Sequence, residues 1–268
     1  MQCRFIDTGF NDAFKNMAID EALLSYCKIP ILRVYGWKPA AISVGYSQDI
    51  EKEINLEYCR KNNIAIVRRL TGGKAIFHDK EITYSFILPE NSNLIPFEVN
   101  ESYRVIASAL KIALEKIGVK AEMKKAPEKI KTPMCFNSSN WYELAVSNKK
   151  ISGSAQRRFN KKVLQHGSLL LNFDYEKNSS LFVLNKNDKI SFENMKQKIT
   201  SLKNETGRNI GYKELGNTLK QGFKETFNFD ILEGNLTDKE IGLAEKLKKE
   251  KYSRREWNFE AQIKVIEN

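Results

Sequence analysis

Two adjacent glycines, Gly72 and Gly73, lie in the segment best suited to hold a ligand. It spans residues 68–79 and reads Arg-Arg-Leu-Thr-Gly-Gly-Lys-Ala-Ile-Phe-His-Asp. Paired glycines between strands let the backbone approach a ligand and leave N–H groups free to bind an oxyanion or carbonyl. The segment is neither a Walker loop, because Gly-Lys-Thr/Ser is missing, nor a dinucleotide fingerprint. A tight turn is the alternative interpretation, and His78 alone is typical of a structural hydrogen-bonding residue.

Cys135 is the candidate nucleophile. It lies in a loop-like stretch with Pro133 before it and serines after it, and a basic segment precedes it. A free thiol has a pKa of about 8.5, and nearby cations lower that pKa and raise the thiolate fraction. A thiolate that accepts an acyl group divides acyl transfer into two easier steps. The alternative, a buried small apolar side chain, fits Cys27 and Cys59, which fall in predicted helices.

Lys150, Gly153 and Ser154 begin the second strand of a predicted hairpin that turns at Ser147 and Asn148. A lysine at this position can pair with a thiolate or a developing oxyanion and stabilise it electrostatically. The alternative is an ordinary surface lysine. The sequence offers no competing Ser-His-Asp arrangement and no paired-carboxylate pattern.

Apolar periodicity predicts the elements that position these residues. Asp12 is expected to cap a helix that runs to residue 27, and residues 101–117 and 212–227 are further predicted helices. After an opening strand, strands are predicted over residues 31–35, 41–44, 64–67, 82–88 and 163–173, the first two of these as a pair. Strands first and helices later predict an α+β fold with a mixed, largely antiparallel sheet and packed helices.

Composition limits the classes of protein that remain. The 268 residues are 41% hydrophobic, which is typical of a globular chain with a real core. No stretch approaches about 18 consecutive apolar residues. We expect no signal peptide before the first strand. Four scattered cysteines without a Cys-x-x-Cys pair, and two histidines, favour neither a disulfide scaffold nor a zinc site. We therefore expect a cytoplasmic protein with reduced thiols and no metal.

The net charge of +11 favours an acidic partner. Nucleic acid is the usual first candidate, but no helix-turn-helix, RNA-binding-sheet or zinc-finger signature accompanies the charge. An acidic protein or a phosphorylated carrier explains the charge equally well. So does a solvated, lysine-rich surface, so charge alone does not identify a partner.

The motifs together resemble the lipoate–protein ligase and octanoyltransferase family. The matches come in family order, cover nearly the whole chain, and lie at residues 16–23, 68–79, 150–156, 166–170 and 251–259. Among them are Asn-Met-Ala-Ile-Asp-Glu-Ala-Leu, Lys-Ile-Ser-Gly-Ser-Ala-Gln and His-Gly-Ser-Leu-Leu. The resemblance implies a biotin/lipoate–protein ligase-like fold. It also implies one catalytic domain over residues 1–268, without the accessory C-terminal domain of two-domain ligases.

Within that family the sequence is most similar to the LipM-type octanoyltransferases. ATP-dependent lipoate ligases typically carry a third glycine after Thr-Gly-Gly, and Lys74 stands at that position here. Residues 80–85 resemble the Arg/Lys-Glu-Leu-Thr-Tyr-Ser run of the LipM type, and residues 133–144 resemble its nucleophile segment. The stretches 153–158 and 164–168 also look like that type.

By this resemblance, Cys135 accepts octanoate from octanoyl-acyl carrier protein as a thioester. Lys150 lowers the pKa of that thiol and stabilises the oxyanion. A lysine of the glycine-cleavage H protein, or of another lipoyl domain, then attacks and leaves with the acyl group as an amide. The residues implied to bind the substrate are Arg69, Gly72, Gly73, His78, Gly153 and Ser154.

The resemblance also implies which cofactors and partners to expect. A thioester is already activated, so its transfer to an amine needs no ATP, and no cofactor or metal is expected. Both carrier proteins are typically acidic in such families, which gives the positive charge a specific use. Neither nucleic acid nor a membrane is an implied partner, and a monomer is expected.

Three alternatives remain. In an ATP-dependent lipoate–protein ligase, Lys150 would contact an acyl-adenylate, ATP and Mg would be needed, and Cys135 would be incidental. A lipoyl-relay amidotransferase also uses a cysteine but takes its acyl group from an already modified H protein. A non-catalytic binder of nucleic acid or acyl groups would form neither a covalent intermediate nor a product.

Overall fold

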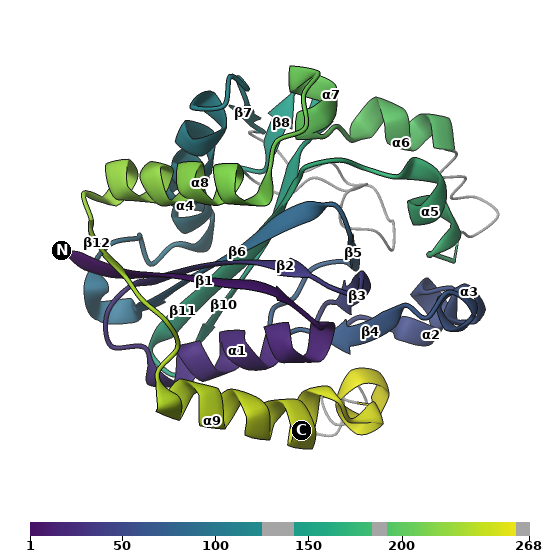
Figure 1. Ribbon diagram of the computed structural model, residues 1–268, viewed down its shortest axis with the longest axis horizontal. Coiled ribbons are helices and arrows are strands. Elements are labelled where there is room, and N and C mark those ends of the chain that lie inside the picture. Colours follow the sequence, from purple (N-terminus) through teal and green to yellow (C-terminus); the bar gives the residue numbers. More distant parts are fainter. Residues whose placement is uncertain (125–141, 184–191, 261–268) are drawn as a thin grey trace.

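The main sheet separates two helical layers in the computed structural model, which describes residues 1–124, 142–183 and 192–260 (Figure 1). Its described strands follow the order β10-β11-β6-β2-β1-β12. They are β1 (Gln2–Asn11), β2 (Ile31–Trp37), β6 (Glu81–Pro89), β10 (Ser152–Phe159), β11 (Lys162–Leu170) and β12 (Asp230–Glu233). The neighbouring strands β10–β11, β11–β6 and β6–β2 pair in antiparallel orientation. Strand β1 pairs in parallel with both β2 and β12. The prediction of an α+β fold with a mixed, largely antiparallel sheet is confirmed.

Helices cover both faces of this sheet (Figure 1). On one face lie α4 (Val99–Glu115) and α8 (Tyr212–Phe227), where the ring of Phe223 packs 5.0 Å from that of Phe86 between centroids. On the other face lie α1 (Ala13–Tyr26) and α9 (Asp238–Leu247). Asp12 accepts a hydrogen bond from the Lys15 amide at 2.9 Å, so the predicted cap of α1 is confirmed.

Two smaller sheets lie beside the main one. They are β4 (Ala65–Arg68)-β3 (Ala41–Val44)-β5 (Ile76–His78) and β7 (Glu122–Met123)-β8 (Leu144–Val146)-β9 (Lys149–Lys150). The β8–β9 hairpin turns through Ser147 and Asn148, both at positive φ, as predicted. Its second strand ends at Lys150, however, and Gly153 and Ser154, which were predicted to belong to it, lie in β10 and pair with β11 in the main sheet.

One predicted strand pairing is wrong. β2 pairs with β1 and β6 in the main sheet, whereas β3 pairs with β4 and β5. Both strands are buried at every residue, so neither has a polar face that would mark it as half of a surface hairpin. Apolar content predicted the strands but could not choose their partners.

Short helices complete the described chain. They are α2 (Ile50–Glu53), α3 (Leu56–Lys61), α5 (Tyr175–Ser180), α6 (Phe192–Lys198) and α7 (Leu202–Thr206), with a 3-10 turn at Glu90–Ser92 and π-helical turns at Lys248–Tyr252 and Glu256–Glu260. Across the three described ranges, none of the helices combines the length and apolar character that crossing a bilayer requires.

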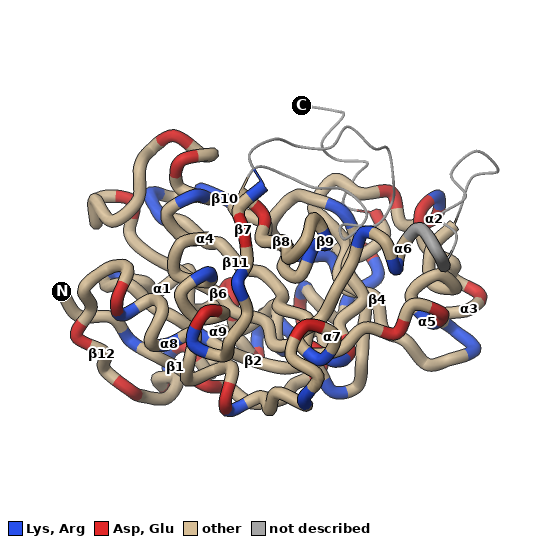
Figure 2. Tube along the Cα trace, turned by 90° about the horizontal axis from the view of Figure 1, so that it is seen from above, with Lys and Arg blue, Asp and Glu red and all other residues tan. Residues whose placement is uncertain are grey.

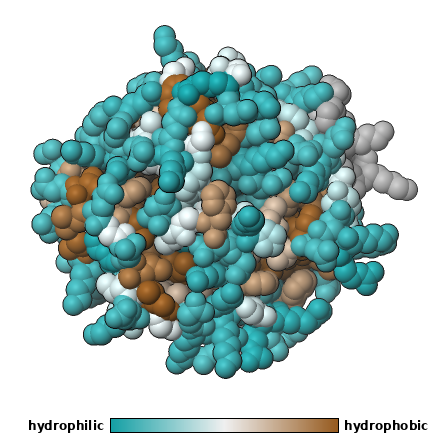
Figure 3. All heavy atoms as spheres, viewed as in Figure 1, coloured by the Kyte–Doolittle hydropathy of each residue, from teal (hydrophilic) through white to brown (hydrophobic). Residues whose placement is uncertain are grey.

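The positive charge is distributed over the molecule. Figure 2 shows Lys and Arg along most elements, interleaved with Asp and Glu, rather than gathered in one stripe. On the face in Figure 3, hydrophilic side chains cover most of the surface, and apolar ones form scattered patches.

Candidate functional site

Five of the predicted site residues line one narrow pocket between the main sheet and the β4-β3-β5 sheet, which we call the inner pocket. They are Arg69, Gly73, His78, Gly153 and Ser154. The other lining residues are Met17, Tyr35, Trp37, Ser43, Ile76, Thr83, Ala155, His166, Gly167 and Ser168. The apolar side chains in this set suit a narrow hydrocarbon chain better than a charged or bulky ligand.

Arg69 holds the glycine segment in shape. Its guanidinium donates to the carbonyls of Gly72 (2.6 Å) and Lys74 (2.9 Å). Gly73 has a φ of +90°, a backbone conformation that is strained for residues with a side chain. Its carbonyl oxygen would lie only 2.0 Å from a Cβ atom if residue 45 carried one instead of being glycine. The segment therefore passes close to neighbouring backbone and presents Gly73 to the pocket, while Gly72 lies outside its lining.

His78 is fixed at the pocket wall by contacts on every side. Its ring stacks on Trp37 with centroids 3.8 Å apart. Nδ1 lies 2.7 Å from a carboxylate oxygen of Glu81, and Nε2 lies 2.7 Å from the hydroxyl of Ser43. The carboxylate favours the proton on Nδ1, so Nε2 accepts from Ser43. His78 therefore shapes the pocket as a structural hydrogen-bonding residue.

Asp20 of α1 forms the centre of a buried polar network beside the pocket. Its carboxylate accepts hydrogen bonds from Arg33 (2.6 Å), Tyr35 (3.0 Å) and Ser85 (2.7 Å). Burial alone would raise the pKa of Asp20, but Arg33, His166 and Ser85 hold that pKa below its usual range. Asp20 is therefore ionised at neutral pH and ties α1 to strands β2 and β6.

His166 connects this network to the glycine segment. Its Nδ1 lies 3.3 Å from Asp20, and its Nε2 lies 2.7 Å from the hydroxyl of Thr71. Burial lowers the pKa of His166 below its usual value, although Asp20 opposes the shift. The ring is therefore neutral at neutral pH.

Sequence reasoning assigned no role to Asp20, Arg33 or His166. A signal was present, because an aspartate in the apolar run Met-Ala-Ile-Asp and an arginine in the apolar strand Ile-Leu-Arg-Val-Tyr are opposite charges in elements that must be buried. Such charges are buried only in pairs. The pairing itself depends on the arrangement of the elements, which the pattern did not specify.

The stability of the protein should depend on pH through His166. Since its pKa is lower in the folded state, the unfolded chain binds the proton more readily as pH falls below about 6.5. We expect the free energy of unfolding, measured with urea, to decrease between about pH 7.5 and about pH 5.5. The variant His166→Gln should show a smaller decrease. Equal pH dependence in both proteins would contradict this assignment.

Lys150 is buried rather than exposed, so its interpretation as an ordinary surface lysine is wrong. Its ammonium lies 2.8 Å from a carboxylate oxygen of Glu143, and the two side chains are 2% and 4% exposed. The lysine ends β9, and β10 carries Gly153 and Ser154 into the inner pocket three and four residues later. The hairpin thus places a buried cation at the entry of β10. Glu143 was not singled out from the sequence.

Cys135 lies outside the described residues. The three described cysteines, Cys3, Cys27 and Cys59, are all buried and free, which confirms the structural interpretation of Cys27 and Cys59. Burial raises the pKa of Cys3 and Cys27 to about 12 and that of Cys59 to about 11. None of these three thiols is a thiolate at neutral pH. In the described ranges there is also no cluster of three or more His, Cys, Asp or Glu that could hold a metal ion.

These raised pKa values predict low thiol reactivity. We expect a maleimide or a disulfide reagent at about pH 8 to leave Cys3, Cys27 and Cys59 unmodified in the folded protein. Urea should make all three reactive, as peptide mass mapping would show. Labelling of any of them before unfolding would contradict the burial that the structure gives them.

The sequence model of the lipoyl protein ligase A/B catalytic domain matches residues 12–224. This range contains α1 with Asp20, the glycine segment and both β10 and β11, so every lining residue of the inner pocket falls within it. The chain belongs to this family. The resemblance that the motifs indicated is therefore confirmed.

Several curated members of the lipoyl protein ligase A/B family are similar over nearly their full length. Proteins named octanoyltransferase LipM share 39% identity in Anoxybacillus flavithermus, 38% in Bacillus subtilis and 40% in Clostridioides difficile. Each comparison covers 96% of this chain, and it covers 97%, 97% and 98% of those relatives.

Solved structures confirm the lipoate–protein ligase-like fold. Lipoate-protein ligase A bound with ATP superposes with a TM-score of 0.81 at 26% identity, over 97% of this chain and 99% of that one. A putative lipoate protein ligase from Thermoplasma acidophilum with bound lipoic acid gives 0.80 at 26% identity, with the same coverage. The fold of the described chain is therefore that of the lipoate–protein ligases.

Proposed function

We propose that this protein is an octanoyltransferase of lipoate biosynthesis that uses Cys135 as its nucleophile. The observation that carries the proposal is 38–40% identity, over 96% of the chain, to three proteins named octanoyltransferase LipM. The inner pocket supports it, because its lining is largely apolar, although its free volume of about 20 Å³ must widen to admit an acyl chain. The high pKa values of the other three thiols also support it, since they leave Cys135 as the cysteine available for chemistry.

The reaction has two balanced steps. The Cys135 thiolate attacks the carbonyl of octanoyl-acyl carrier protein, and the carrier thiol leaves with a proton. A neutral lysine amine of the acceptor then attacks the enzyme thioester, an amide forms, and the Cys135 thiol is released. Both steps pass through a tetrahedral oxyanion and start from an activated ester, so neither requires ATP or another cofactor.

Lys150 supplies the positive charge for both steps. A cation near a thiol favours the thiolate and lowers the pKa of the thiol, and it also stabilises the oxyanion. The buried ion pair with Glu143 supports this role, because it orients the ammonium in a site of low polarity. The same ion pair keeps the buried charge of Lys150 compensated.

The acyl chain is proposed to lie in the inner pocket, between the glycine segment and β10. Arg69 and Gly73 line one wall, Gly72 is bonded to Arg69 outside the lining, and His78 closes the wall against Trp37. Gly153 and Ser154 form the facing wall, where the hydroxyl groups of Ser154 and Tyr84 lie 2.8 Å apart. These are the proposed substrate-binding residues.

The donor is octanoyl-acyl carrier protein, and the acceptor is a lysine of the glycine-cleavage H protein or of another lipoyl domain. Acidic partners of this kind complement the net charge of +11. We place the reaction in the cytoplasm and propose that the chain acts as a monomer with one catalytic domain over residues 1–268.

The test is to incubate the enzyme with octanoyl-acyl carrier protein and unmodified H protein, without ATP, and to measure intact masses. The expected result is one octanoyl group on the enzyme, which disappears as one octanoyl group appears on the H protein. Modification of H protein only with ATP, Mg and free acid would instead identify a ligase. Transfer only from lipoylated H protein would identify a lipoyl-relay amidotransferase. If neither an adduct nor a product formed under any of these conditions, the protein would be a non-catalytic binder.

A further inference from the structure

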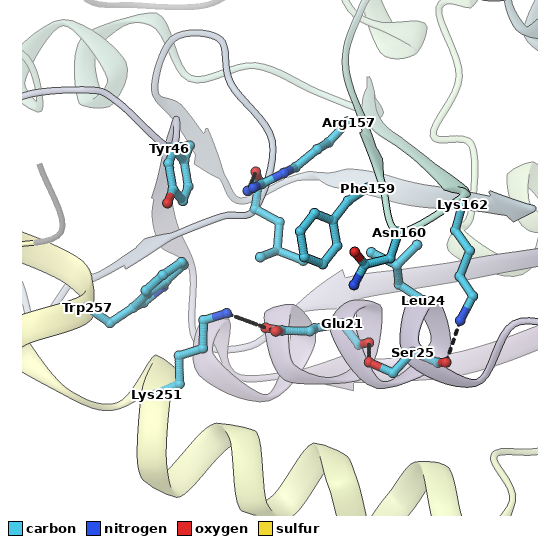
Figure 4. Close-up of a pocket in the computed structure, with 11 residues that line it drawn as sticks. Glu21, Leu24, Ser25, Tyr46, Arg157, Phe159, Asn160, Lys162, Lys251 and Trp257 are labelled. Carbon is cyan, nitrogen blue, oxygen red and sulfur yellow. Dashed lines mark hydrogen bonds and ion pairs between the residues drawn. The ribbon is translucent and has the colours of Figure 1, made fainter. Parts of the chain in front are cut away.

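A second pocket lies among α1, the β10–β11 turn and the C-terminal residues 251–257, and we call it the outer pocket (Figure 4). Its volume of about 460 Å³ falls within the range of about 300–1,000 Å³ that is typical of small-molecule sites. Among the described residues, it shares no lining residue with the inner pocket, and none of the proposed substrate-binding residues lines it. The proposed acyl transfer therefore gives this pocket no role.

Aromatic side chains stand on opposite sides of the outer pocket. Figure 4 shows Tyr46 and Trp257 on one side of the space and Phe159 on the other. The ring centres of Tyr46 and Trp257 lie 5.9 Å apart in an edge-to-face arrangement. Leu24 and Leu70 add aliphatic surface. An apolar group of a ligand would leave water here and gain contact with these side chains.

Two cations that line the outer pocket have no carboxylate partner among the described residues. Nη1 of Arg157 donates to the carbonyl of Leu70 at 2.8 Å, and the ammonium of Lys162 donates to the carbonyl of Ser25. A carbonyl oxygen carries only a partial negative charge, so neither contact neutralises its cation. The remaining N–H groups of the guanidinium can still donate to an anion.

Glu21 does not cancel this positive charge, because its carboxylate is already paired. Its two oxygens accept from the ammonium of Lys251 at 2.9 and 2.7 Å, and one of them accepts from the hydroxyl of Tyr252 at 2.6 Å. The described lining carries three cations (Arg157, Lys162 and Lys251) and this one carboxylate, which gives a net charge of +2. The pocket therefore attracts an anion.

Arg157 is held at the pocket wall before any ligand binds. Its guanidinium carbon lies 4.7 Å from the ring centre of Tyr46 and 5.2 Å from that of Phe159. The rings and the carbonyl of Leu70 together restrain the guanidinium. Because the side chain is already ordered, binding an anion there costs little additional side-chain entropy.

We propose that the outer pocket binds a small organic anion. Its carboxylate or phosphate group bonds the guanidinium of Arg157, and its apolar body lies against Trp257 and Phe159. A guanidinium bonds either anion through two parallel N–H groups, so the charge selects the anionic class. The aromatic walls add the second requirement, an apolar body. A bare inorganic ion and a neutral hydrocarbon each satisfy only one of the two.

The test measures the binding of naphthyl phosphate to the full chain by titration calorimetry. The inner pocket, with a free volume of about 20 Å³, is too narrow for a naphthyl ring. Naphthol keeps the ring without the charge, and inorganic phosphate keeps the charge without the ring. We expect saturable binding of naphthyl phosphate, and a Kd at least about tenfold higher for each of the other two. Naphthoate then shows whether a carboxylate or a phosphate is preferred.

Two variants assign the binding to the outer pocket. Arg157→Gln should raise the Kd of naphthyl phosphate by about tenfold or more, because it removes the charged donor. The matched control is Arg208→Gln, because Arg208 pairs with Glu214 outside the lining, and its Kd should stay near wild type. Phe159→Ala should raise the Kd by about fivefold. Its control is Phe97→Ala, since that ring is 79% exposed and also lies outside the lining.

Three results would overturn the proposal. The first is that neither naphthyl anion binds wild type saturably. The second is that naphthol binds as tightly as naphthyl phosphate, since the cations would then have no part. The third is an unchanged Kd in folded Arg157→Gln and Phe159→Ala proteins, which would place the ligand elsewhere. None of these measurements involves acyl transfer, so the proposed octanoyltransferase function stands or fails separately.

Discussion

Octanoyl transfer by the Cys135→Ala variant is expected to be at least about 1,000-fold slower than by wild type, with no acyl adduct on the enzyme. The reason is chemical, because without the thiolate the acceptor amine must attack the carrier thioester directly. That path lacks the covalent intermediate that divides the reaction. Single-turnover rates and intact masses with octanoyl-acyl carrier protein measure both effects.

Cys59→Ala is the matched control for this variant. Its thiol is buried with a pKa of about 11, so its removal should leave the adduct and the transfer rate near wild type. Cys135→Ser is a second control, since a serine hydroxyl keeps the shape of the side chain but is far less ionised. A Cys135→Ala protein that transfers octanoate at the wild-type rate would exclude the thioester mechanism. If the activity of the Cys135→Ala protein required ATP, the ligase alternative would replace the thioester mechanism.

Local features of the fold were predictable from the sequence. The helix expected over residues 212–227 coincides with α8, and Asp12 caps α1 as expected. The turn at Ser147 and Asn148 was also correct. In each case a few neighbouring residues determine the structure, through helical periodicity, a side-chain cap or residues that tolerate positive φ.

Features that depend on distant parts of the chain were not predictable in the same way. The parallel strand β12 pairs with β1 from more than 200 residues away, and its short run Asp-Ile-Leu-Glu gives no local sign of a partner. The wrong pairing of β2 with β3 has the same origin. Local patterns define elements, while long-range burial selects their neighbours.

The candidate site shows the same division between local and distant information. The glycine segment and the start of β10 were recognisable as motifs, and the structure brings both to one pocket. The ion pair between Lys150 and Glu143 was not recognisable from the sequence, because a lysine is usually exposed and the residues around it look like a surface turn. Only the packed hairpin shows that this lysine is buried beside a carboxylate.

Lys150→Met is expected to slow adduct formation by about 100-fold or more at neutral pH and to destabilise the fold. Methionine fills similar space but removes the charge that favours the thiolate and the oxyanion. Without the cation, the pKa of the Cys135 thiol should rise toward about 8.5, so the rate should increase with pH over a higher range than in wild type. The variant would also remove the buried ion pair between Lys150 and Glu143, and breaking such a pair typically costs about 3–5 kcal/mol.

The double variant Lys150→Met with Glu143→Gln separates the two effects. Glutamine removes the buried negative charge, so the free energy of unfolding should recover most of the loss seen in Lys150→Met alone. The rate of adduct formation should remain low at neutral pH and increase with pH, because the cation is still missing. A double variant that recovers both stability and the wild-type pH profile would show that Lys150 acts only on folding. If the double variant recovers stability but still forms the adduct slowly, the ammonium of Lys150 acts in the reaction, because the hairpin is then folded and only the charge is missing.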